Sequence, residues 1–181
     1  MALKSTIFKA ELQIADMDRS YYADHSLTLA RHPSETDERM MVRLLAFALN
    51  AHERLAFGKG LSDVEDPDLC LADLTGTIEL WIEVGLPDEK AIRRAAGRAG
   101  KVIVYSYGRG ADIWWKQTAK ALEGDRRIGV VRLPDEATRE LAGLAKRNMR
   151  LQCTIQDGQV WLTDGETSVQ LEPRFLQGEV E

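Results

Sequence analysis

Cysteine, histidine and long apolar runs are scarce in this sequence, and each scarcity excludes a class of site. The two cysteines, Cys70 and Cys153, stand far apart and match no CxxC or zinc-ligand spacing. We therefore expect buried, reduced thiols rather than a disulfide or a metal site. The three histidines, His25, His32 and His52, have no metal-binding spacing either, and no GxSxG segment occurs. We expect the histidines to be structural.

No apolar run approaches the ~20 residues that a membrane-spanning helix requires. The first residues, MALKSTIFKAELQ, alternate in the manner of a strand and lack the apolar core of a signal peptide. The sequence therefore predicts a cytoplasmic protein that makes no contact with membranes.

Positive charge is also in deficit. The chain has 24 Lys and Arg against 29 Asp and Glu, which gives a net charge of -5. This balance argues against a protein that coats nucleic acid through bulk electrostatics. A local nucleic-acid-binding patch stays open as an alternative to solvated helix faces, because the basic residues form two clusters. These are Arg93, Arg94, Arg98 and Lys101, and Lys146, Arg147 and Arg150.

The overall amino-acid composition is typical of a globular protein. Apolar residues make up 44% and charged residues 29% of 181 residues, enough for one well-buried core. We therefore expect residues 1–181 to form a single domain.

The spacing of apolar residues predicts an order of strands and helices. The expected elements are strands at 8–14 and 27–29, a helix at 35–55 with Ser34 as its N-cap, a glycine-rich acidic loop at 57–68, a hairpin at 69–85, and a helix starting at Pro87. Strand and helix then alternate before a C-terminal β-meander, in which QDGQ predicts a tight turn. The expected class is α/β (α+β), with a central mixed β-sheet flanked by helices.

One acidic residue lies on the apolar face of the first predicted helix. Val42, Leu45 and Leu49 form a stripe with the 3.6-residue period, and Glu38 falls on the same stripe. A carboxylate facing the core needs a hydrogen bond, a cation or a metal. Glu38 is therefore either a functional acid or a first-turn residue that satisfies the helix N-terminus.

The hairpin brings two carboxylates together. If residues 75–76 form a two-residue turn, Cys70 lies opposite Trp81 and Asp68 lies opposite Glu83. Directly opposed residues have Cβ atoms ~5 Å apart, so these carboxylates would repel each other. Mg²⁺ or Mn²⁺, which prefer oxygen ligands, would relieve that repulsion.

Asp73 is the alternative first ligand. In the same register it lies on the face of the strand away from Glu83. It is also about five residues along the strand, which at ~3.3 Å per residue is too far for Asp73 and Glu83 to share one metal ion. A longer turn would reverse this preference, because a slip of one residue exchanges the faces of the strand.

The order of Pro67-Asp68, a turn, Glu83-Val84-Gly85 and a helix resembles the PD-(D/E)xK nuclease superfamily. More specifically, nearly the whole chain resembles the YaeQ family. The segments that carry this resemblance are MALKSTIFKA, LTLARHPSETDERMMVRLLAF, LWIEVGLPDEK, IWW at 113–115 and TIQDGQVWL.

The resemblance implies a variant of the restriction endonuclease-like fold, in a family with no established biochemical function. In that fold carboxylates gather at one edge of a mixed sheet that is flanked by helices. By resemblance, Glu38 would be an acid carried by a helix, and Asp68 and Glu83 would be metal ligands.

The chain departs from the nuclease motif at Gly85, where the motif requires lysine. In active members of the superfamily, that lysine orients the attacking water and stabilises charge that develops on the phosphate. Some members supply the cation from the following helix, where this chain has Lys90, Arg93 and Arg94. Lys90 is the first choice, because a helix begun at Pro87 keeps it near the strand end. The alternative is a solvated surface lysine.

Two functional hypotheses follow. The first is a Mg²⁺- or Mn²⁺-dependent nuclease, with Asp68 and Glu83 as ligands, Glu38 as an assisting acid, and Lys90 or a neighbouring arginine as the cation. The second is a non-catalytic regulatory module that binds nucleic acid or protein on the same fold, which Gly85 and the acidic net charge favour. The sequence names neither a substrate nor an oligomeric state.

Overall fold

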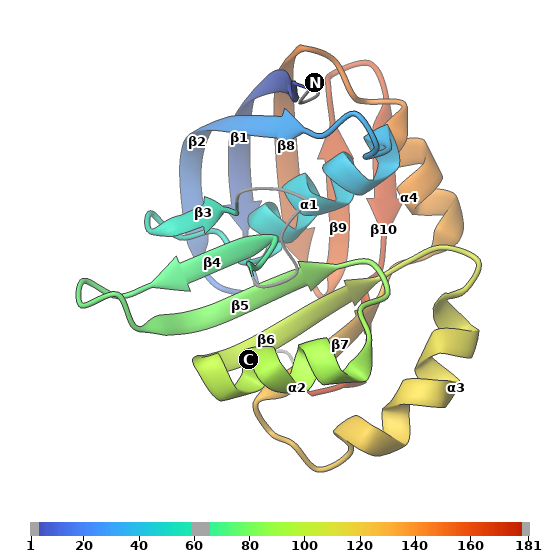
Figure 1. The fold of residues 1–181 in the computed structure, drawn as a ribbon. Helices are drawn as coiled ribbons and strands as arrows, with labels where there is room; N and C mark the ends of the chain where they lie inside the picture. Colours follow the sequence, from blue (N-terminus) through green and yellow to red (C-terminus); the bar gives the residue numbers. More distant parts are fainter. Residues whose placement is uncertain (1–3, 59–65, 179–181) are drawn as a thin grey trace.

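The computed structural model describes residues 4–58 and 66–178, which form two β-sheets and four helices (Figure 1). The five-stranded sheet has, in spatial order, β10 (Ser168–Leu171), β9 (Gln159–Thr163), β8 (Asn148–Gln156), β1 (Thr6–Asp16) and β2 (Tyr21–Arg31). The six-stranded sheet has β11 (Arg174–Gln177), β7 (Ile128–Arg132), β6 (Ala99–Ser106), β5 (Ile78–Val84), β4 (Leu69–Ala72) and β3 (Leu55–Phe57). The helices are α1 (Asp37–Leu49), α2 (Glu89–Arg98), α3 (Ala111–Leu122) and α4 (Asp135–Ala142).

Both sheets are mixed, because β1 pairs parallel to β8 in the first, and β5, β6 and β7 are parallel to one another in the second. The mixed α+β class is therefore confirmed, but the expected single central sheet is replaced by two. Within the described ranges, no helix is both long enough and apolar enough to cross a membrane.

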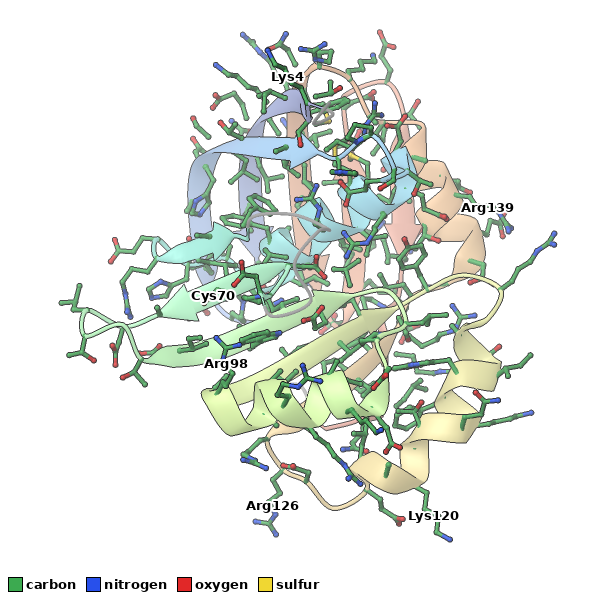
Figure 2. The ribbon with its side chains drawn as sticks, in the orientation of Figure 1. Lys4, Cys70, Arg98, Lys120, Arg126 and Arg139 are labelled. Carbon is green, nitrogen blue, oxygen red and sulfur yellow. The ribbon has the colours of Figure 1, made fainter. Side chains whose placement is uncertain are left out.

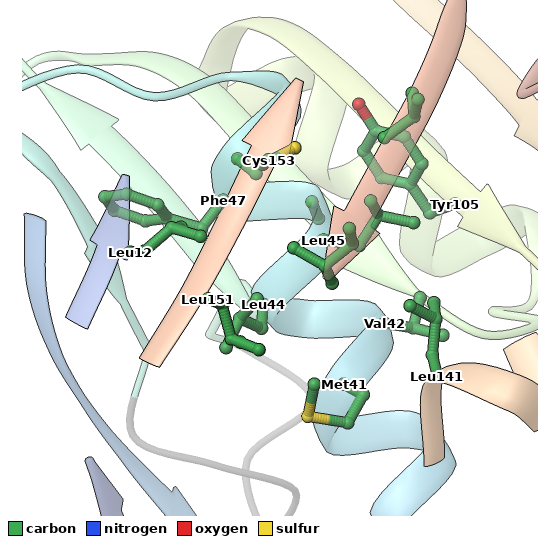
Figure 3. Close-up of a cluster of buried hydrophobic side chains, with 14 of the residues drawn as sticks. Leu12, Met41, Val42, Leu44, Leu45, Phe47, Tyr105, Leu141, Leu151 and Cys153 are labelled. Carbon is green, nitrogen blue, oxygen red and sulfur yellow. The ribbon is translucent and has the colours of Figure 1, made fainter. Parts of the chain in front are cut away.

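Helix α1 lies between the two sheets. Every residue from Met40 to Ala48 is buried, because a helix that contacts sheets on two sides has no solvated face. One hydrophobic cluster joins α1 to Leu12 and Leu151 of the first sheet and to Tyr105 of the second (Figure 3). A second cluster lies on the other face of the six-stranded sheet, under α2 and α3. Strands β6 and β7 are buried on both faces as a result, which explains their continuous apolar sequence.

The hairpin of β4 and β5 has the predicted pairing near Asp68, but its turn differs from the predicted one. Cys70 pairs with Trp81 as expected. The turn, however, contains three residues, 74–76, and is closed at Asp73, so the expected two-residue turn is wrong. A bulge after Leu71 absorbs the extra residue. This compensation restores the register that the longer turn would otherwise have shifted.

Capping explains where the predicted helix bounds were wrong. The Thr36 hydroxyl accepts the Arg39 N–H and starts α1, whereas Ser34 instead bonds the His32 ring. The helix ends at Leu49 rather than at 55, because residues 55–57 pair as β3. Helix α2 begins after Asp88, whose carboxylate accepts two backbone N–H groups of the first turn, and not at Pro87.

The C-terminal part of the chain contains one predicted turn and one strand that was not predicted. The tight turn predicted at QDGQ is confirmed, with φ values of 53° at Asp157 and 75° at Gly158. Strand β11 was not predicted, and it pairs antiparallel to β7 at the edge of the second sheet. Of the acidic loop predicted at 57–68, residues 59–65 lie outside the described residues.

Candidate functional site

Asp68 ends the pairing of β4 with β5 and lies beside Glu83. Its backbone N–H donates to the Ile82 carbonyl at 2.9 Å, and its Oδ2 accepts the Val84 N–H at 2.8 Å. The Asp68 carboxylate thus accepts an N–H of β5 that a backbone carbonyl of a paired strand would otherwise accept. Because these bonds hold Asp68 in a nearly buried position, its carboxylate is fixed next to the Glu83 side chain.

The Glu83 carboxyl group titrates far from its ordinary range. Burial is the largest cause, and the neighbouring Asp68 carboxyl adds to it, so that the pKa of Glu83 rises to about 7. The Trp81 indole N–H, which donates to Glu83 at 2.7 Å, and the charge of Arg39 both lower this pKa. Glu83 is therefore partly protonated at neutral pH.

Two arginines of α1 neutralise the other acids of this region. Arg39 donates to Asp68 at 2.8 Å and to Glu35 at 2.7 Å, and it also reaches the Val84 carbonyl at 3.3 Å. Arg43 donates to both oxygens of Glu35, at 2.9 and 2.6 Å. Two guanidinium groups thus balance two carboxylates. Glu83 is left without a direct ion pair to any described residue.

Glu38 and Lys90 are not joined to this carboxylate pair. Glu38 lies half-buried in the first turn of α1, where it accepts the Thr138 hydroxyl of α4 at 3.0 Å. Lys90 lies exposed in the first turn of α2, and its backbone N–H donates to Asp88. Within residues 4–58 and 66–178, no group of three or more His, Cys, Asp or Glu side chains is arranged to hold a metal ion. Of the residues predicted for the site, only Asp68 and Glu83 are shown to interact with each other.

The rival acid, Asp73, belongs to the hairpin turn. Its Oδ1 accepts the Thr75 N–H at 2.8 Å, the Thr75 hydroxyl at 2.6 Å and the Thr77 N–H at 2.9 Å. These bonds lower the pKa of the Asp73 carboxyl. Asp73 thus organises the turn.

The backbone explains why Gly85 carries no side chain. Its φ is +111°, a value that residues with a Cβ rarely adopt, and its N–H donates to the Tyr105 carbonyl at 2.9 Å. A lysine here would have open space around its Cβ but a strained backbone. The lysine of the nuclease motif therefore does not suit this strand end.

Glu35, Arg39 and Arg43 were not predicted from the sequence as members of this cluster. Their spacing of four residues would have placed them on one side of a helix, and two buried arginines on a helix require acidic partners. Tyr107, which follows β6 and interacts electrostatically with Arg39 and Glu38, was not predicted either. Burial, the largest cause, raises the pKa of Tyr107 to about 12.

The cysteines and His25 have no sign of a catalytic or metal-binding arrangement among the described residues. Cys70 and Cys153 are free thiols, as expected, but only Cys153 is buried, and the expected burial of Cys70 is wrong because it lies half-buried. His25 bonds the Tyr21 hydroxyl at 2.7 Å and contacts the Phe47 ring edge-on.

Arg98, from the first basic cluster of the sequence, lies beside β5 (Figure 2). Arg98 places its guanidinium 5.0 Å from the centre of the Trp81 ring. Figure 2 shows Arg98 beside β5, whereas Lys120, Arg126 and Arg139 project from separate parts of the surface. These labelled basic side chains thus lie apart from one another (Figure 2).

Comparison with known proteins identifies the family. The family model described as YaeQ protein matches residues 1–173. The chain belongs to the YaeQ family. It is 46% identical over 172 residues to the uncharacterised protein YaeQ of Escherichia coli K12, covering 94% of this chain and 95% of that protein. It is also 46% identical over 173 residues to the YaeQ protein of Salmonella typhi, covering 95% of this chain and 96% of that protein.

Solved YaeQ structures have the same fold. The crystal structure of the YaeQ protein from Xanthomonas axonopodis pv. citri has a TM-score of 0.94 at 50% identity, covering 97% of this chain and 99% of that one. The YaeQ structure from Pseudomonas syringae has a TM-score of 0.92 at 36% identity, covering 97% of each chain. The family is one of uncharacterised function, so membership establishes the fold and leaves the activity to the chemistry of the site.

Proposed function

We propose that this protein is a divalent-metal-dependent nuclease, a variant of the PD-(D/E)xK superfamily whose metal ligands are Asp68 and Glu83. The observation that supports this most directly is the pairing of two adjacent carboxyl groups, of which only Asp68 has an ion pair with a described residue. Ionised Glu83 would give the group of Glu35, Asp68, Glu83, Arg39 and Arg43 one net negative charge. A cation at Glu83 would balance that charge.

The donor set fits Mg²⁺ or Mn²⁺. Mg²⁺ is usually held by one or two carboxylates, with water and substrate phosphate completing its coordination. Each carboxylate oxygen has two acceptor positions, so the bonds to Arg39 and Val84 leave Asp68 with lone pairs to offer. When bound, such a metal would polarise a phosphate oxygen and lower the pKa of a bound water.

Arg39 lies beside the place of the missing lysine. Its guanidinium contacts Asp68 and the carbonyl of Val84, the residue that precedes Gly85. A planar guanidinium can also bond two oxygens of one phosphate. We therefore assign the role of the motif lysine to Arg39. Lys90, the choice from the sequence, stays the rival, and Glu38 stays an assisting acid.

In hydrolysis at this site, the residues of the chain would mainly position the reactants and stabilise charge. Asp68 and Glu83 would position the metal and its water, and Arg39 would stabilise charge on the phosphate. Water would attack phosphorus, the bond to the leaving oxygen would break, and that oxygen would take up a proton. The products would be a phosphomonoester and a hydroxyl end.

A second candidate is a non-catalytic module that binds nucleic acid or protein on the same fold. The observation that favours it is the direct ion pair of Arg39 with Asp68, at 2.8 Å, which occupies the cation that turnover would require. Such a module would bind metal without cleaving any substrate.

The test is a cleavage assay on single- and double-stranded DNA and RNA with Mn²⁺ or Mg²⁺. We expect wild-type protein to cleave at least one substrate and Glu83→Gln to lose about 10²-fold or more in rate. Glu79→Gln, on the same strand, is the matched control and should retain activity. Arg39→Lys should be slower than Lys90→Ala, whose rate should stay within about twofold of wild type.

Three other outcomes of the cleavage assay would change the proposal. Cleavage that survives in Glu83→Gln at the wild-type rate would show contamination and contradict the site. Saturating metal binding without cleavage of any substrate would favour the binding module. A loss of activity in Lys90→Ala, with Arg39→Lys unaffected, would return the cation to Lys90.

A further inference from the structure

A pocket lies at the opposite end of α1 from the carboxylate pair. Helix α1 fills the space between the two sheets as far as Leu49, and both sheets continue beyond it. This leaves a cavity of about 180 Å³ between them. Its apolar walls come from Ile103, Val131 and Phe175 of the second sheet and from Ile155 of the first.

The pocket also contains two polar groups that are linked to each other. The Asn50 side-chain amide donates to the Tyr105 hydroxyl at 2.8 Å. Tyr105 is only 3% exposed, and no described residue accepts its hydroxyl hydrogen. A buried hydroxyl that still has a hydrogen to donate is suited to an acceptor on a ligand.

The lining contains two acids and two cations, and among the described residues one of the cations has no ion-pair partner. Asp16, which is buried, pairs with Arg19 at 2.7 Å. Asp18 accepts the backbone N–H groups of Asp157 and Gly158, at 2.7 and 2.9 Å, and so belongs to their turn. Lys101 is half-buried, shares the inner face of β6 with Tyr105, and forms no ion pair with a described carboxylate.

We propose that this pocket binds a small amphipathic carboxylic acid, with an apolar ring between the sheets and its carboxylate at Lys101. The size supports a ring with a short substituent, because an apolar cavity of about 150 Å³ is known to hold benzene. The Tyr105 hydroxyl would donate to the same carboxylate or to a polar ring substituent. This site is separate from the proposed nuclease site and does not depend on it.

The test uses phenylacetate as the probe and backbone amide NMR as the readout. We expect phenylacetate to shift amide signals of 101–105, 131 and 175, and neutral benzyl alcohol to bind about tenfold more weakly. Lys101→Met should weaken phenylacetate about tenfold, and Tyr105→Phe should weaken it severalfold. Lys116→Met, an exposed lysine on α3, is the matched control and should change nothing.

Two results would overturn the proposal. Amide signals around the pocket that stay unshifted at about 10 mM phenylacetate would show that no such site exists. Equal affinity for phenylacetate and benzyl alcohol, or unchanged affinity in Lys101→Met, would show that the pocket does not select a carboxylate. Thermal unfolding of each variant, compared with wild type, separates lost binding from lost folding.

Discussion

At the scale of single residues, the side chains around Glu83 decide its protonation. Burial and the Asp68 carboxyl raise the pKa of Glu83, while the indole N–H of Trp81 lowers it by stabilising the carboxylate. Replacing Trp81 with phenylalanine removes that donor, so the pKa of Glu83 should rise above its wild-type value of about 7. Carbon-13 NMR titration of the glutamate carboxyl groups measures this pKa. Trp161→Phe is the control, and an unchanged value in Trp81→Phe would contradict the assignment.

Gly85 gives a second prediction at this scale. Because its φ is +111°, Gly85→Ala should destabilise the protein by about 1–2 kcal/mol. Gly97 lies inside α2 at ordinary helical φ with open space around it, so Gly97→Ala should stabilise by up to about 1 kcal/mol. Urea unfolding measures both changes. If Gly85→Ala were as stable as wild type, backbone strain would not explain the missing lysine.

At the scale of elements, α1 is fixed at its start by buried charge. Arg43 is 3% exposed, bonds both oxygens of Glu35, and also donates to the Ala30 carbonyl of β2 at 3.0 Å. Arg43→Met leaves Glu35 with Arg39 alone, so we expect a loss of about 3–5 kcal/mol. The double variant Glu35→Gln/Arg43→Met should lose less than the sum of the two single variants. Additive losses in urea unfolding would contradict a direct pair.

The hairpin shows how far sequence alone predicted an element. The predicted pairing of Cys70 with Trp81 was correct, because a bulge after Leu71 offset the extra residue of the turn. The turn length and the bulge were not predictable from cross-strand counting, because they depend on local bonds such as those of Asp73. The two errors compensated, so the neighbourhood of Asp68 was predicted for a partly wrong reason.

At the scale of the whole molecule, the sequence predicted the class and most of the elements but not the two sheets. Periodicity shows which face of a strand is apolar and does not show which sheet covers it. The burial of α1 on both sides is a tertiary property for the same reason. Arg39 was missed as a cation because its contact with Asp68 joins residues 29 positions apart.

The stability of the molecule should depend on pH through Glu83. Its folded pKa of about 7 lies above its ordinary value of 4.5, so its stabilising contribution is complete below pH 4.5 and is lost as pH rises through 7. Glu83→Gln cannot ionise. Relative to wild type, it should therefore gain about 1–3 kcal/mol between pH 5 and pH 8 in urea unfolding. Parallel pH profiles for the two proteins would argue against a raised pKa.

The proposed nuclease activity depends most on whether Asp68 and Glu83 together bind a divalent cation. Calorimetric titration of Mn²⁺ at pH 8 tests this directly, with wild type, Glu83→Gln and the control Glu79→Gln. We predict one site in wild type and in Glu79→Gln, and affinity at least about tenfold weaker in Glu83→Gln, because one of two carboxylate ligands is lost. Equal Mn²⁺ affinity in wild type and Glu83→Gln, or no binding to wild type, would contradict the account.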